Sequence, residues 1–108
     1  MTMHIAADEL LQELALLDAT MARVSRQAGQ GQDPTLERRL DTHLRSLRVL
    51  LDSNGAAIAE DTIDAAKRAL DSAEPDAPML MLKMARANLA AVVRRQAARS
   101  EGFAARAA

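Results

Sequence analysis

The first quarter of the chain carries a regular pattern of apolar side chains. They recur at alternating spacings of four and three residues, at Met3, Ala7, Leu10, Leu14, Leu17, Met21, Val24 and Ala28. This spacing places them on one side of a helix and is typical of a helix that packs along a seam. Acidic Asp8 and Glu9 near its start and basic Arg26 near its end suit the helix dipole. The pattern predicts a helix from about residue 6 to residue 28.

A second leucine-rich pattern follows a short break. Gly29 and Gly31 interrupt the first pattern, and Asp33-Pro34 supplies a capping side chain followed by proline at the first helical position. The repeating positions are then Leu36, Leu40, Leu44, Leu47 and Leu51. Ser53-Asn54-Gly55 tolerates the left-handed conformation in which helices commonly end. We therefore predict a second helix over about 34–53.

The second half of the chain has a weaker pattern. Between residues 57 and 73 the repeating positions offer two large side chains, Ile63 and Leu70, among alanines that would let a neighbouring helix come close. Pro75 and Pro78 mark a turn, and the next helix is expected over about 77–100, where Gly102 stops it. These boundaries predict a single domain over residues 1–100 and a frayed tail over residues 101–108.

The composition favours an all-α fold. The chain has 24 alanines and one aromatic residue, so strand-favouring side chains are scarce and helix formers dominate. Short connections between helices favour antiparallel neighbours. The expected architecture is an antiparallel four-helix bundle. The alternative is a pair of helical hairpins that completes its core by dimerisation.

The charges are unevenly distributed along the chain. The net charge is −1, so the protein as a whole has no field that would attract nucleic acid or an anionic membrane. Residues 52–78 contain seven acidic and two basic side chains, a net −5, whereas residues 79–108 contain six basic and one acidic, a net +5. The last two predicted helices are therefore electrically complementary.

The sequence is that expected of a cytoplasmic protein. It contains no cysteine, and therefore neither a disulfide nor a thiolate site. The amino terminus has no basic region of the kind that begins a signal peptide. The longest nearly apolar run, residues 77–82, is far shorter than the roughly 18 residues of a membrane span. Arginine outnumbers lysine 12 to 2, which is typical of a GC-rich, bacterial genome.

The most suggestive run is Pro78-Met79-Leu80-Met81-Leu82-Lys83-Met84. Its five apolar side chains cannot share one helical face, because successive residues are rotated by about 100°. Either the other helices bury this turn on several sides, or one side stays uncovered and contacts a partner. Methionine suits the second role because its flexible thioether adapts to varied surfaces. The partner-binding candidates are Met79, Leu80, Met81 and Met84.

Arginines on the last predicted helix offer a possible basic surface. They are Arg86, Arg94, Arg95 and Arg99. Their spacing spreads them over more than one side of the helix, and no aromatic residues lie between them for base stacking. We expect a solvated face paired with the acids of the preceding helix, and the pattern does not favour nucleic-acid binding.

Histidine chemistry is limited to two residues, His4 and His43. His43 lies on the apolar flank of the second predicted helix, where we expect a half-buried, hydrogen-bonded side chain at a helix contact. The alternative is a pH-sensitive interface. Neither histidine stands in the spacing of a zinc or di-iron helix, so no metal site is predicted.

The candidate acid-base groups do not make a catalytic motif. Asp8, Glu9 and Glu13 are carboxylates on a helix surface with no nucleophile motif beside them, and the Gly29-Gln30-Gly31 run precedes proline rather than a phosphate-binding helix. We expect no enzyme activity, no cofactor and no small-molecule substrate.

The leading hypothesis is a protein-binding module, and itself or another protein is the expected partner. It would act as an adaptor, chaperone or inhibitor, with a homodimer expected, through the seam of the first helix or the run that begins at Met79. Two alternatives stay open, a nucleic-acid-associated regulator that uses the four arginines and a structural subunit that assembles with itself.

Overall fold

The computed structural model describes the backbone of residues 2–107 and the side chains of residues 7–100. Four helices account for nearly all of the described backbone, and no strand occurs among these residues. They are α1 (Thr2–Gln27), α2 (Pro34–Leu50), α3 (Ser53–Asp71) and α4 (Asp76–Ala107). The all-helical class and the number of helices are confirmed.

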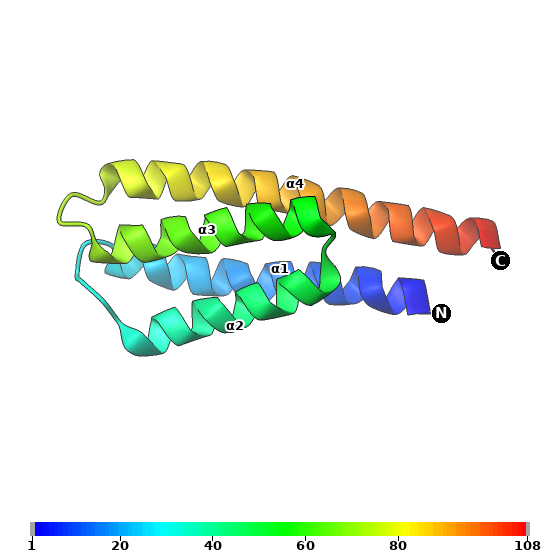
Figure 1. Cartoon of the computed structure of the whole chain (residues 1–108), viewed down its shortest axis with the longest axis horizontal. Helices are drawn as coiled ribbons and strands as arrows, with labels where there is room; N and C mark the ends of the chain where they lie inside the picture. Colours follow the sequence, from blue (N-terminus) through cyan, green and yellow to red (C-terminus); the bar gives the residue numbers. More distant parts are fainter. Residues whose placement is uncertain (1, 108) are drawn as a thin grey trace.

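The helices lie side by side in an elongated molecule whose principal extents are 53 × 23 × 20 Å. The connections over 28–33 and 72–75 lie together at one end, whereas the connection over 51–52 lies toward the other (Figure 1). Both α2 and α4 pack against α1 and α3. In the described part of the chain the backbones of α2 and α4 do not run close together, so the two helices lie diagonally across the molecule and meet where α2 ends.

The core lies along the seams that the sequence pattern predicts for the first two helices. On α1 the side chains of the seam from Ala7 to Val24 are buried, and on α2 the repeating leucines are buried as well. The helix α3 contributes Ile63 and Leu70 among alanines, as predicted. Met3, at the start of the predicted seam, lies outside the residues with described side chains.

The loop between α1 and α2 is held against the end of α3. Gly29 and Gly31 adopt φ values of 81° and 97°, which favour glycine. The Gly29 N–H donates to the carbonyl of Ala69 at 3.0 Å, and the Gly31 N–H donates to that of Leu70 at 2.9 Å. The loop therefore satisfies two carbonyls at the end of α3 that have no partner within their own helix.

The boundary between α2 and α3 differs from the prediction. We expected Ser53-Asn54-Gly55 to end α2, but α2 ends at Leu50 and these three residues form the first turn of α3. The reason is Asp52, whose carboxylate accepts a hydrogen bond from the Gly55 N–H at 2.8 Å and caps α3. Gly55 is buried, and a Cβ atom there would lie 3.1 Å from Val92 on α4.

The same boundary is braced by a residue from the far end of the sequence. Gln96 on α4 donates from Nε2 to the carbonyl of Leu50 at 2.7 Å and accepts at Oε1 from the Asp52 N–H at 3.3 Å. The bond to Leu50 satisfies an end carbonyl of α2. The contact fixes the α2–α3 junction against α4.

The outer ends of α1 and α4 also differ from the prediction. The helix α1 begins at Thr2 rather than near residue 6, and α4 continues through Gly102 to Ala107 rather than ending near Ser100. Glycine weakens a helix interior by only about 1 kcal/mol and does not by itself end the helix. The predicted frayed tail falls on residues 101–108, whose side chains lie outside the described set.

Candidate protein-binding surface

The run from Met79 to Met84 occupies the first turns of α4. Leu82 is buried, and Met79 is partly buried against the core. By contrast, Leu80, Met81 and Met84 are 59%, 54% and 62% exposed. Because all three point away from the core, we call them the outer α4 patch. We predicted that the five apolar side chains of this run could not all lie on one helical face, and they are divided between the core and the surface.

Grooves run along both sides of the outer α4 patch. Between α3 and α4, a groove of about 310 Å³ is lined by Met81 and Met84 opposite Asp61, Asp64 and Arg68. Between α1 and α4, another of about 360 Å³ is lined by Met79 and Leu80 opposite Met21 and Ser25. The four predicted partner-binding residues therefore do not form one pocket. They make a ridge between two shallow grooves.

An ion pair fixes α4 beside the patch. Arg86 donates from Nε and Nη2 to the two carboxylate oxygens of Asp18 on α1, at 2.7 and 2.8 Å. These hydrogen bonds raise the pKa of Arg86 above its ordinary value, partial burial opposes the rise, and attraction to the Asp18 charge adds to it. Arg86 is thus charged at all physiological pH values, and the two-point contact ties α4 to α1.

The four candidate arginines do not gather on one surface. Arg86 pairs with Asp18 on α1, rather than with an acid of α3 as we expected. Arg99 lies 3.7 Å from Asp52, the residue that caps α3. Arg94 and Arg95 are exposed. Two of the four side chains are therefore engaged by carboxylates of the same molecule, on different sides of α4.

His43 lies at the contact between α2 and α1, as expected. It is 9% exposed, with Nε2 2.8 Å from the hydroxyl oxygen of Thr20 and Nδ1 3.1 Å from a carboxylate oxygen of Glu13. The Thr20 hydroxyl also donates to the Leu16 carbonyl at 3.3 Å. His43 therefore joins two helices and lies away from the outer α4 patch.

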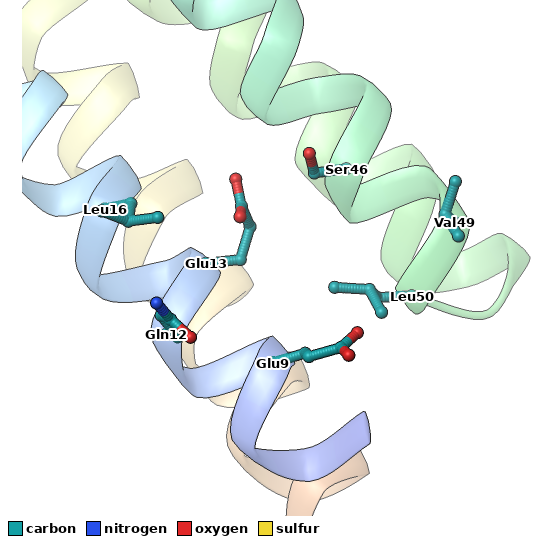
Figure 2. A pocket seen from close by; sticks show the side chains of 7 residues that line it. All are labelled: Glu9, Gln12, Glu13, Leu16, Ser46, Val49 and Leu50. Atoms are coloured by element: carbon teal, nitrogen blue, oxygen red, sulfur yellow. The ribbon is translucent and has the colours of Figure 1, made fainter. Parts of the chain in front are cut away.

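Sequence reasoning missed a third groove, between α1 and α2. Its volume is about 440 Å³, and it is lined from α1 by Glu9, Gln12, Glu13 and Leu16 and from α2 by Ser46, Val49 and Leu50. Figure 2 shows Glu9 extending toward Leu50 across this groove. The signal in the sequence was that Leu16 and Val49 fall outside the apolar seams of their helices. In the structure their side chains are 49% and 84% exposed.

The described part of the α1 seam is buried in the core, although we expected the seam as one of two candidate binding surfaces. Its leucines, Leu10, Leu14 and Leu17, are at most 5% exposed and belong to the core. The structure explains this directly, since α1 packs against each of the other three helices. Of the two expected surfaces, only the outer α4 patch is accessible.

The described residues hold no cluster of three or more histidine, cysteine, aspartate or glutamate side chains able to bind a metal ion. Among the helices of the described chain, none has an apolar stretch long enough to cross a bilayer. No protein-family model matches the sequence, and no significant match is found among curated proteins or among solved structures.

Proposed function

We propose that this chain is a non-enzymatic protein-binding module, of the adaptor, chaperone or inhibitor type, whose outer α4 patch receives a helix of a partner protein. The four helices act as an antiparallel bundle that holds α4 in place. The cytoplasm is the proposed location, which suits a chain without cysteine.

The observation that carries the proposal is the exposure of three large apolar side chains within five residues of one helix. Leu80, Met81 and Met84 are each more than half exposed. Single exposed apolar residues are common, but a contiguous group on a rigid element is typical of a contact surface. Two methionines in the group adapt to the shape of a partner at little cost.

The surroundings of the patch suit a helix as ligand. The grooves on either side run between neighbouring helices, and the ridge between them presents residues spaced as one helix presents them to another. The neighbouring Arg86–Asp18 pair keeps α4 in register with α1. By comparison, the dispersed arginines of α4 provide no continuous basic face along which a nucleic-acid backbone would lie.

Cross-linking in cells of the source organism tests this proposal. A photoreactive amino acid replaces Met84 in one variant and Arg38, an exposed residue of the diagonal helix α2, in the other. We expect discrete cross-linked products from position 84, because a bound partner would cover that residue. Mass spectrometry then identifies the protein joined to the chain.

The variant at residue 38 controls for random collision, since it is equally reactive and lies on another surface. Products formed from position 84 and not from position 38 support the proposal. If neither position gives a discrete product, or if both give the same products, the outer α4 patch is not a specific binding surface and the proposal is wrong.

A further inference from the structure

Two residues of the outer α4 patch, Leu80 and Met84, belong to a longer exposed stripe. Ala77, Leu80, Met84, Ala87 and Ala91 are all exposed and follow one another at spacings of three, four, three and four residues. This is the heptad spacing with which one helix packs along another. The helix α4 therefore carries a second seam, on the side opposite to the one that packs in the core. We call it the outer α4 stripe.

The stripe is large at one end and small at the other. Leu80 and Met84 occupy the end nearer the start of α4, whereas Ala87 and Ala91 follow. If a second α4 lies antiparallel across it, Leu80 faces Ala91 of the second copy and Met84 faces Ala87 of the second copy. Large side chains then meet small ones in both of these layers, as close packing requires.

The charges beside the stripe have the same symmetry. Asp76 and Arg94 are both exposed. They are 18 residues apart, which is five turns at 3.6 residues per turn, so they flank the stripe on the same side. A two-fold axis between antiparallel helices brings the same flank of both copies together. In the register set by the apolar layers, Asp76 therefore lies beside Arg94 of the second copy, and the pair forms twice.

A parallel arrangement has neither advantage. It would place Leu80 and Met84 against their own equivalents and leave the alanines facing alanines. It would also bring Arg94 and Arg95 close to Arg94 and Arg95 of the other copy, where like charges repel. Shape and charge thus favour the same orientation independently.

Resting on the proposed function, we infer that the ligand of the outer α4 patch is a second copy of this chain, and that two α4 helices pair antiparallel about a two-fold axis between Met84 and Ala87. Each copy contributes the outer α4 stripe, and each apolar end covers the other's alanines. Two Asp76–Arg94 contacts between the copies close the ends of this interface.

Sedimentation equilibrium of the purified chain tests the inference. The expected mass at high concentration is twice 11.6 kDa. We expect Met84→Glu to raise the dimer dissociation constant at least about tenfold, because a carboxylate at the centre of the interface loses its water. Val49→Glu is the matched control. It introduces the same charge at an apolar residue that is 84% exposed on α2, and we expect no change in dissociation constant.

A charge exchange tests the register. Asp76→Arg and Arg94→Asp each place like charges opposite one another, and each is expected to raise the dissociation constant about threefold to tenfold. The double variant restores opposite charges and is expected to return the constant close to that of the parent chain. Because the double variant keeps both substitutions, local damage to α4 would persist in it and would prevent this recovery.

Engineered cysteines test the orientation, since the natural chain has none. A mixture of Leu80→Cys and Ala91→Cys chains should form disulfide-linked heterodimers under mild oxidation, whereas the Leu80→Cys chain alone should not link to itself. Efficient linkage of Leu80→Cys to itself would show parallel helices and contradict the inference.

The outcomes separate this inference from the proposed function. A chain that stays at 11.6 kDa up to millimolar concentration overturns self-association, and so does a dimer that neither Met84→Glu nor the charge exchange affects. If cross-linking from residue 84 then yields a different protein, the proposed function still holds with another ligand. If residue 84 yields no product either, both proposals are wrong.

Discussion

At the scale of single residues, the hydrogen-bonded group around His43 shows how much a sequence position can reveal. Its place beside the repeating leucines of α2 predicted a half-buried histidine at a helix contact; the structure confirms the contact and shows a more deeply buried side chain, 9% exposed. Its partners, Thr20 and Glu13, were not predictable, since they lie 23 and 30 residues away on α1. To find them, one must know how α1 and α2 are rotated about their own axes relative to each other. The spacing of apolar residues fixes this rotation only to within several tens of degrees.

The Thr20 hydroxyl should stabilise the fold through this group. We expect Thr20→Val to lower the free energy of unfolding by about 1–2 kcal/mol, because it preserves the shape of the side chain and leaves the buried Nε2 of His43 without its partner. Urea unfolding followed by circular dichroism measures the change, and is suited to a chain without Trp or Tyr.

Thr42→Val is the matched control for this substitution. Thr42 also donates to the carbonyl four residues before it, Arg38, but it is exposed. We expect a change within about 0.5 kcal/mol. Equal effects of the two substitutions would show that the contact with His43 contributes no stability.

At the scale of elements, the connection between α2 and α3 shows where local signals mislead. Ser53-Asn54-Gly55 is a sequence that commonly ends a helix, and the same residues also suit the start of one. The deciding contacts come from Asp52, which caps α3, and from Gln96, which reaches the junction from α4. The first contact is local in the sequence, whereas the second depends on a residue 46 positions from its partner.

The capping role of Asp52 can be tested by two substitutions at the same position. We expect Asp52→Ala to lower the free energy of unfolding by about 1 kcal/mol, because the Gly55 N–H loses its acceptor. Asp52→Asn retains an oxygen that can accept this bond and is expected to cost only a few tenths of a kcal/mol. Thermal unfolding at 222 nm compares the two variants with the parent chain.

The asparagine variant also controls for charge. Both substitutions remove the negative charge that lies 3.7 Å from Arg99, and this exposed contact should contribute little. If the two variants are destabilised equally, the stabilising effect of Asp52 comes from its charge, and the assignment of a cap is wrong.

At the scale of the whole molecule, four helices and the seams of α1 and α2 follow from the spacing of apolar residues alone. Exposed apolar surface somewhere in the run from Met79 to Met84 was predictable, because the run exceeds what one helical face can bury. Which members face outward was not predictable. It depends on the rotation of α4, which contacts with α1 and α3 set, including the Arg86–Asp18 pair and the burial of Leu82.

The exposed surfaces of the molecule also differ in how apolar they are. The outer α4 stripe is continuous and apolar, whereas the groove between α1 and α2 is lined by Glu9 and Glu13 beside its apolar residues. A helix that docks on the stripe buries the apolar side chains of the stripe without placing a carboxylate at the centre of the contact. For this reason we assign partner binding to α4 rather than to the larger groove between α1 and α2.

Whether the outer α4 patch is covered in the functional complex can be measured by the solvent exposure of methionine methyl groups. Nuclear magnetic resonance of methyl-labelled methionine, with a soluble nitroxide, should show strong broadening of Met81 and Met84 in the dilute free chain and little at Met21, which is 5% exposed. In the complex with its partner, whether a second copy or the protein found by cross-linking, Met84 should become as protected as Met21. Broadening of Met84 that is unchanged by complex formation would show that the patch stays uncovered and that it is not the binding surface.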